Sequence, residues 1–318
     1  MRRKIQSEMK QIVFFMLLLH GMAVTAYGSG RALSDGPGFL RPGGSGQSAG
    51  SGSAASPREM EFVLYLMARD ELDEALYLLN RMQGFGRAGA DSISYLKGWT
   101  LYRQKELLPS AAQLLEVSET SPFYVKSRFF AAYNLAHMGH VADARSVLAS
   151  ATLPGGALME DMRSFQFAGM ALLDKDFEGF ARHSEGFGRA SHLFSEEAGR
   201  MLGYHDDLRQ FPSRSPLLAG ALSAAVPGLG KIYAGKTAEG IAGFLYVAAM
   251  GATAWDFHRG AGPGSVLFIL SASVTGIFYI GNIWGSAVAV IRQRNEFRHE
   301  MDQRILFDMH IPLRNAFN

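Results

Sequence analysis

Apolar residues recur at helical spacing over residues 57–211, with few β-branched runs and no hairpin signals between them. At this spacing, residues i, i+3 and i+4 share one face of a helix. Beyond residue 214 the pattern changes, because three almost uncharged apolar segments follow at residues 216–229, 241–257 and 266–291. The pattern therefore predicts an all-α chain, with amphipathic helices first and wholly apolar helices afterwards.

The amphipathic region repeats itself with a period of about 34 residues. Residues 104–107 align with residues 138–141, and Gly98 aligns with Ala132. Each unit reads as a helix with a small residue in its middle, a tight turn, and a second helix such as residues 109–117 or 142–150. Paired helices approach closely only where side chains are short, which is the role expected of Gly98, Ala132 and Ala144.

These features resemble the tetratricopeptide repeat, a helix-turn-helix unit that stacks into a superhelix. The resemblance implies about four hairpins over residues 58–211, ending in a helix at residues 195–210. Ser110 and Phe180 depart from it, because the family prefers alanine there. Stacked hairpins commonly bind a partner on their concave face. Candidate lining residues are Tyr95, Arg103, Arg128 and Asn134, although for any single one of them a solvated or packed position is the favoured interpretation.

A five-residue motif, Gly-Phe-Gly-Arg-Ala, occurs at residues 84–88 and again at residues 186–190. The first copy, with Gly89, also spells G-x-G-x-x-G, which binds dinucleotides only after a strand and before a helix. Here the motif follows a predicted helix at residues 71–82, so we interpret both copies as glycine-rich helix ends and expect no cofactor.

The first 28 residues have the pattern of a secretory signal peptide. Basic residues including Arg2, Arg3 and Lys4 precede a short apolar run and then small residues. An uncleaved anchor is the alternative, but the run is short for a bilayer and is followed by His20. Residues 29–57 are rich in Gly and Ser and predict a flexible linker.

The composition of the chain excludes several classes of function. The chain has no cysteine, which excludes disulfides, thiolate catalysis and a lipoprotein anchor. Its net charge of +2 gives no reason to expect nucleic-acid binding. The histidines form no metal-binding pattern and no catalytic motif is present, so we expect neither a metal nor catalytic residues.

Residues 212–292 predict a membrane domain of two to three transmembrane helices, followed by a tail at residues 293–318. The third apolar segment is long enough to cross a bilayer, and the second is just long enough. The first is so short that it could be re-entrant. A buried soluble bundle is the alternative. If all three segments cross and the repeats are exported, the cytoplasmic cations are Lys231, Lys236, Arg292, Arg294 and Arg298, in modest agreement with the positive-inside rule.

A nucleotide-binding alternative arises at residues 230–237, which satisfy G-x-x-x-x-G-K-[ST]. In that motif backbone N–H groups cradle phosphates, and here Lys236 and Thr237 would contact phosphate and Mg²⁺. The chemistry also needs a buried strand before the loop. Residues 217–225 are rich in Ala and Leu and predict a helix instead.

The same stretch resembles small bacterial membrane domains with a Pro-Gly-x-Gly-x-x-Tyr-x-Gly-Lys turn, carried here by Pro227, Gly228, Gly230, Tyr233, Gly235 and Lys236. A later Gly-Asn-aromatic-Gly pattern corresponds, shifted by one residue, to residues 281–285. Gly281 and Gly285 are expected to pack against a helix, and Asn282 to hydrogen-bond across to one. The resemblance implies membrane residence and little chemistry.

The sequence thus predicts a non-enzymatic scaffold anchored in the bacterial inner membrane, with its repeats on the periplasmic side. Expected partners are other envelope proteins on the repeat face, the lipid bilayer, and further copies through the small-residue helix faces, without nucleic acid. A nucleotide hydrolase and a small membrane conduit are the alternatives.

Overall fold

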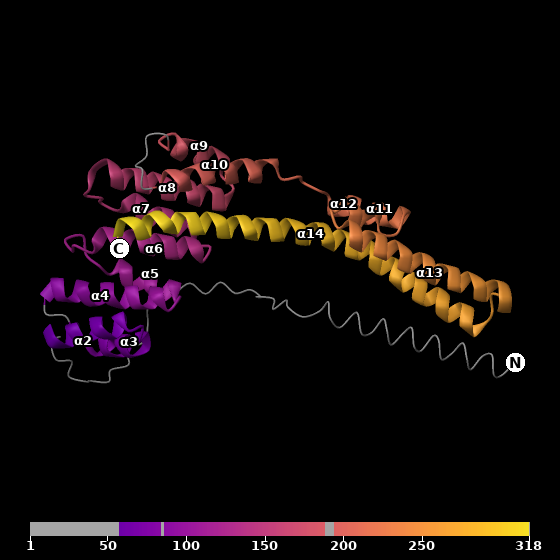
Figure 1. The fold of residues 1–318 in the computed structure, drawn as a ribbon, viewed down its shortest axis with the longest axis horizontal. Coiled ribbons are helices and arrows are strands. Elements are labelled where there is room, and N and C mark those ends of the chain that lie inside the picture. The colour runs from indigo at the N-terminus through magenta and orange to yellow at the C-terminus, as the bar shows by residue number, and fades with distance from the viewer. Residues whose placement is uncertain (1–56, 84–85, 188–193, 318) are drawn as a thin grey trace. The chain divides into compact units, whose positions relative to one another are not determined.

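The computed structural model describes residues 57–83, 86–187 and 194–317, and all of them belong to one compact unit. The described residues form thirteen helices and no strand (Figure 1). The expectation of an all-α fold is therefore confirmed. The signal peptide of residues 1–28 and all but the last residue of the linker lie outside the described part of the chain.

The first eight of these helices form consecutive hairpins. The hairpins are α2 (Pro57–Ala68) with α3 (Leu72–Arg81), α4 (Gly86–Arg103) with α5 (Leu107–Leu115), α6 (Tyr124–His137) with α7 (Val141–Ser150), and α8 (Gly156–Asp174) with α9 (Phe177–Ser184). A single helix, α10 (Ser195–Gln210), follows them. Four hairpins and a final helix were expected, and the bounds of that final helix are those predicted.

Each hairpin turns through one residue with positive φ, at Asp70, Lys105, Gly139 and Lys175. A left-handed residue after a helix lets the next N–H groups bond back to its last carbonyls. The alignment of residues 104–107 with 138–141 is confirmed for the turn conformation, because the aligned residues Lys105 and Gly139 have φ values of 66° and 83°. Both copies of the five-residue motif follow second helices but lie partly outside the described residues.

Close packing inside a hairpin depends on Gly98, as expected. A Cβ at this position would lie 2.6 Å from Leu114 Cγ and 3.1 Å from its backbone nitrogen. Beside it, the fully buried Ser110 hydroxyl donates to the Gly98 carbonyl at 2.7 Å and accepts from Asn134 Nδ2 at 2.9 Å. These two hydrogen bonds satisfy the Ser110 hydroxyl as donor and as acceptor, which accounts for a serine at this buried position.

We expect Gly98→Ala to lower the free energy of unfolding by about 2 kcal/mol, because the new methyl group must displace Leu114. The matched control is Gly199→Ala on α10, where no atom lies within 4 Å of an added Cβ. That control should be neutral or slightly stabilising, since alanine favours helix. Equal unfolding temperatures for the two variants would contradict the packing role of Gly98.

The apolar region contains α11 (Pro216–Ala225), α12 (Leu229–Tyr233), α13 (Thr237–Ala261) and the first half of α14 (Val266–Phe317). Of the helices described, α14 alone is long and apolar enough to cross a membrane by length and composition, and its most apolar window is 6% buried. A soluble bundle would bury these segments, whereas here Ile277, Ile280 and Trp284 are 67–74% exposed. Within the described chain, these three side chains are not buried in a helix bundle.

The helix α14 does not end where the third apolar segment ends. It continues for 52 residues, so the boundary expected between residues 292 and 293 falls inside a helix. Its second half packs against α6, α8 and α10, while its first half packs against α11 and α13 (Figure 1). The tail is thus an ordered part of the repeat region's core.

Candidate functional site

The second half of α14 contacts the repeat helices through one face. Met301, Ile305, Met309 and Leu313 recur every four residues and are at most 4% exposed. Residues at this spacing share a side of the helix. All but Met301 belong to the same buried cluster as Phe129 of α6, Phe165 of α8 and Met201 of α10. The chain's own C-terminal helix therefore covers part of α6, α8 and α10.

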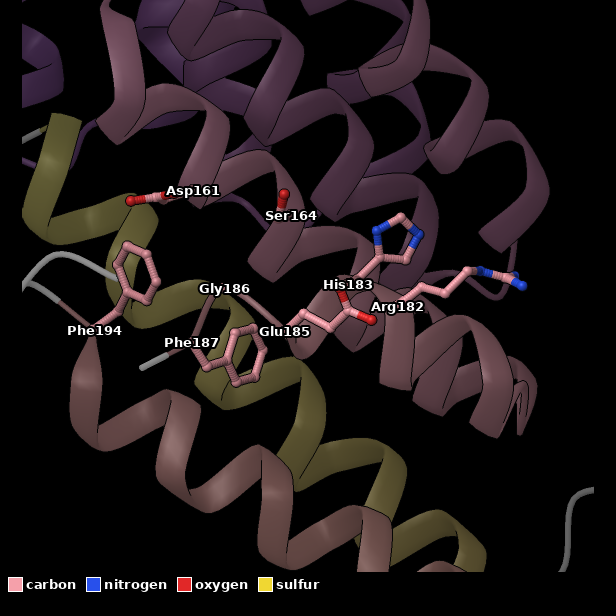
Figure 2. Close-up of a pocket in the computed structure, with 8 residues that line it drawn as sticks. All are labelled: Asp161, Ser164, Arg182, His183, Glu185, Gly186, Phe187 and Phe194. Atoms are coloured by element: carbon pink, nitrogen blue, oxygen red, sulfur yellow. The ribbon is translucent and has the colours of Figure 1, made fainter. Parts of the chain in front are cut away.

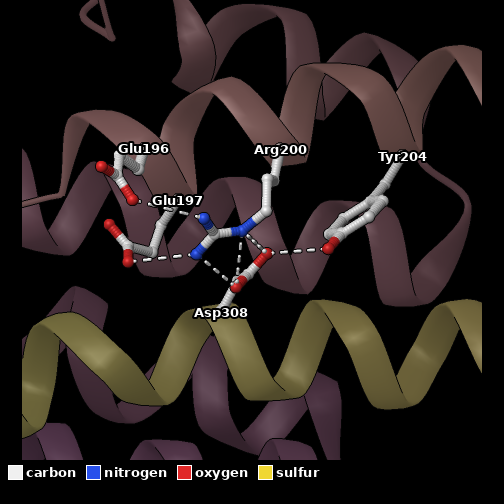
Figure 3. Close-up of polar contacts among 5 residues, drawn as sticks. All are labelled: Glu196, Glu197, Arg200, Tyr204 and Asp308. Atoms are coloured by element: carbon white, nitrogen blue, oxygen red, sulfur yellow. Dashed lines mark hydrogen bonds and ion pairs between the residues drawn. The ribbon is translucent and has the colours of Figure 1, made fainter.

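A charged cluster fixes this helix to α10 (Figure 3). Arg200 Nε lies 3.1 and 3.0 Å from the two carboxylate oxygens of Asp308, and Arg200 Nη2 donates to Oδ1 at 2.9 Å. The Tyr204 hydroxyl donates to the same carboxylate at 2.9 Å, and Glu197 accepts from Arg200 at 3.1 Å. The hydrogen bonds to Asp308 raise the pKa of Arg200. Asp308 is 1% exposed, so the cluster compensates a buried charge.

Further polar contacts run along α14. Gln166 Nε2 on α8 donates to the Met309 carbonyl at 2.8 Å, and Lys175 pairs with Asp302 at 2.5 Å. Lys126 Nζ on α6 donates to the Phe317 carbonyl at 2.9 Å, at the helix end where carbonyls lack partners. These bonds hold α6 and α8 in fixed register with α14.

His310 lies in an aromatic layer formed by α4 and α6. Its ring stacks on Tyr133 with centroids 5.0 Å apart, and its Nε2 forms a hydrogen bond with the Tyr102 hydroxyl. Burial lowers the pKa of His310, with smaller contributions from Arg314 and His137. Burial has the opposite effect on the acidic hydroxyl of Tyr102, whose pKa it raises to about 12. The layer is therefore neutral at physiological pH, which suits its packed position.

The four residues predicted to line a partner face make internal contacts. Tyr95 is 8% exposed and stacks on Phe123 with centroids 4.3 Å apart. Arg103 donates to the Met67 carbonyl and pairs with Asp70, while Arg128 donates to two carbonyls at the end of α5. Asn134 is fully buried beside Ser110. They join neighbouring hairpins, and their role in partner binding stays a prediction.

Exposed aromatic side chains lie elsewhere, on the first hairpin. Phe62, Tyr65 and Tyr77 are 50–59% exposed, and the first two stack with centroids 6.2 Å apart. Sequence reasoning did not single them out, because an exposed and a buried aromatic look alike in an amphipathic pattern. In the sequence, such residues can be recognised where a helix carries more apolar residues than its one buried face can hold.

The glycine-rich turn is built from close backbone contacts. Gly228 and Gly235 both have φ of 84°, a region that suits glycine. A Cβ on Gly228 would overlap the Gly240 carbonyl oxygen, and one on Gly230 would overlap the Ala219 carbonyl oxygen. The Tyr233 hydroxyl accepts from the Ser215 backbone at 3.2 Å. Gly228 and Gly230 thus let α12 lie against α13 and α11, as the tight-turn interpretation requires.

This geometry does not suit a phosphate cradle. The element before the loop is the helix α11, where a nucleotide-binding loop needs a strand. The loop's N–H groups also have internal acceptors: Gly230 N bonds Ser223 Oγ, Gly235 N bonds the Ile232 carbonyl, and Lys236 N bonds the Lys231 carbonyl. These donors are not free to bind an anion.

The three residues predicted for helix packing are two glycines and an asparagine, which differ in what surrounds them. Around Gly281 no atom lies within 4 Å of an added Cβ, and at Gly285 the nearest atom is Lys231 Cε at 3.8 Å. Asn282 is buried, but its side-chain oxygen and nitrogen have no hydrogen-bond partner, contrary to the expectation that it bonds across to another helix. Within the described chain, no helix lies close to Gly281, whereas Asn282 Oδ1 would lie 2.9 Å from a Cβ built on Gly243 of α13.

A pocket of ≈ 280 Å³ lies between α8 and α9 (Figure 2). Asp161, Glu185, Arg182 and His183 contribute charges of both signs, and burial lowers the pKa of His183. In the view shown, Asp161 lies apart from Arg182 and His183 (Figure 2). Across the described residues, no group of three or more metal-ligating side chains is placed to hold an ion.

Comparison with known proteins identifies no relative: no protein-family model, no curated protein and no solved structure matches the chain.

Proposed function

We propose that the chain is a non-enzymatic, membrane-anchored scaffold of the bacterial envelope, in which tetratricopeptide-like repeats present a surface to protein partners. The observation that carries this proposal is the division of α14. Its first half has exposed apolar side chains, among them Val266 and Ile277 at 70–71% exposure, whereas its second half buries its apolar face against the repeats. One helix thus joins an apolar, lipid-compatible segment directly to the repeat core.

The contacts of α14 also limit the number of membrane crossings. Residues 301–313 pack on the repeat helices, so the tail and the repeats lie on the same side of any membrane. An even number of crossings satisfies this condition and three crossings do not. We therefore propose that the first half of α14 crosses, and that α13, which at 25 residues is long enough but less apolar than α14, crosses beside it to form a hairpin. The ten-residue α11 is too short to cross and would be re-entrant.

The N-terminal signal pattern supports a periplasmic location for the repeats. In this arrangement Arg259 is the one lysine or arginine between residues 237 and 291 and marks the cytoplasmic turn. Lys231, Lys236 and the arginines after residue 291 would face the periplasm. These cations lie close to the ends of both crossing helices, so this arrangement runs against the positive-inside rule, and the proposal rests instead on the contacts of α14 with the repeats.

Single-cysteine labelling tests this topology, because the natural chain has no cysteine. In intact inner-membrane vesicles, we expect Ser213→Cys and Asn315→Cys to react with a membrane-impermeant maleimide from the same side. Gly264→Cys, in the turn between α13 and α14, should react only from the opposite side. Labelling of Ser213→Cys and Asn315→Cys from opposite sides would overturn the hairpin. Loss of the unmodified chain from carbonate-washed membranes would overturn the anchor.

A further inference from the structure

Lys231 lies in an unusual place for a charged side chain. Its Cε is the nearest atom to a Cβ built on Gly285 of α14, at 3.8 Å, and its Nζ lies 3.8 Å from a Cβ built on Gly243 of α13. Gly285 precedes Arg292 by seven residues, which at 1.5 Å per residue is about 10 Å inside the apolar segment. The amine therefore points between α13 and α14, below the ends of both apolar helices.

The polar neighbour of Lys231 is Asn282. The same Cβ position on Gly243 is 2.9 Å from Asn282 Oδ1, so the amide and the amine both face this glycine. Asn282 is 7% exposed, and neither of its side-chain polar atoms has a partner. Lys231 has no ion pair among the described residues, whereas nearby Lys236 pairs with Glu239 at 3.7 Å. A buried amide and an unpaired ammonium group at this depth are costly unless a ligand satisfies them.

The surface around the pair is shaped to admit a helix. Gly281 and Gly285 form a G-x-x-x-G pair on α14, and no atom of the described chain approaches Gly281. Such pairs let a second transmembrane helix approach the backbone closely. Trp284, next to Gly285 in the chain, is 74% exposed and adds apolar surface beside this pair. Within the described chain, only Lys231 approaches Gly285 and no atom approaches Gly281.

We propose that this face, defined by Lys231, Gly243, Gly281, Asn282 and Gly285, binds a transmembrane helix of another protein that carries a glutamate or aspartate at the depth of Lys231. The carboxylate accepts hydrogen bonds from Lys231 Nζ and Asn282 Nδ2, and Asn282 Oδ1, which can only accept, takes a second hydrogen bond from the Lys231 ammonium group. The proposal rests on the membrane-anchored scaffold above and names its partner class.

A second copy of the chain does not supply this carboxylate. The acidic residues between positions 216 and 291 are Glu239 and Asp256. Glu239 pairs with Lys236 at the start of α13, and Asp256 lies thirteen residues beyond Gly243, about 20 Å along the helix. In copies that share one membrane orientation, neither reaches the depth of Lys231. The occupant is therefore a different membrane protein.

The test uses the full chain in lipid vesicles with a fluorophore on a single cysteine at position 264. The probe is a synthetic Leu/Ala transmembrane peptide with one glutamate about 10 Å below its end, against the same peptide with leucine there. We expect the glutamate peptide to bind at least about tenfold more tightly, as for a hydrogen-bonded charge. Lys231→Met should abolish this preference, and Asn282→Leu should reduce it.

Two controls separate this site from general charge effects. Lys236→Met removes a neighbouring cation that already has a partner, and Arg259→Met removes one at the opposite end of α13; both should keep the glutamate preference. An equal preference in wild-type and Lys231→Met chains, or no preference at all, would overturn the inference. So would a Lys231 effect seen only with phosphatidylglycerol, which would assign the amine to a lipid headgroup. Flotation with the vesicles checks the anchor separately, since a chain that does not float refutes the scaffold itself.

Discussion

Arg200→Met is expected to cost about 3 kcal/mol in the docking of α14 on the repeats, because it leaves a buried carboxylate without its cation. Asp308 is 1% exposed and retains only the Tyr204 hydroxyl in this variant. Hydrogen exchange of residues 301–313 measures the effect locally, since the exchange rate reports the free energy of opening that segment. The repeats themselves should remain folded, because their other contacts with α14 are separate from this cluster.

The control for this prediction is Arg304→Met. Arg304 pairs with Glu300 on the same helix, but both side chains are more than half exposed, so the change should cost less than about 0.5 kcal/mol. A second arm removes both charges of the cluster, in Arg200→Met with Asp308→Leu. It should recover most of the lost protection, because no unpaired charge remains buried. Unchanged exchange in Arg200→Met alone would show that Asp308 does not depend on its arginine.

The repeat hairpins follow from local signals in the sequence. Turn residues such as Lys105 and Gly139 and small residues such as Gly98 act within one hairpin, and helical periodicity sets the helix faces. The final helix at Ser195–Gln210 was predictable for the same reason. Hydropathy also located the apolar helices, although it did not determine how many of them cross the membrane.

The docking of the C-terminal residues could not be predicted in the same way. The spacing of Met301, Ile305, Met309 and Leu313 shows an amphipathic helix, but nothing in the spacing says what covers it. The contact joins residues more than a hundred positions apart, as in Arg200 with Asp308. Such pairing depends on how the hairpins stack. Because the stacking of the hairpins is not visible in the sequence, Tyr95, Arg103 and Asn134 were predicted as surface residues, while the fold places them between helices.

The largest effect in the apolar region is expected for the turn glycines. In Gly228→Ala the new Cβ would overlap the Gly240 carbonyl oxygen at a residue whose φ is 84°, and in Gly230→Ala it would overlap the Ala219 carbonyl oxygen. Backbone atoms cannot move aside as a side chain can, so each change should cost about 3 kcal/mol or more. We expect α12 to separate from α11 and α13 in both variants.

A disulfide between α11 and α14 reports that separation. Ser223 Oγ and Ser286 Oγ lie 2.7 Å apart, so Ser223→Cys with Ser286→Cys should oxidise readily in this cysteine-free chain. Adding Gly228→Ala or Gly230→Ala should lower the disulfide yield severalfold, because both glycines hold the turn that follows α11. Adding Gly281→Ala should not, since no atom lies within 4 Å of its added Cβ. Equal yields in all three backgrounds would mean that the turn tolerates a methyl group and that its glycines do not set the packing of the apolar helices.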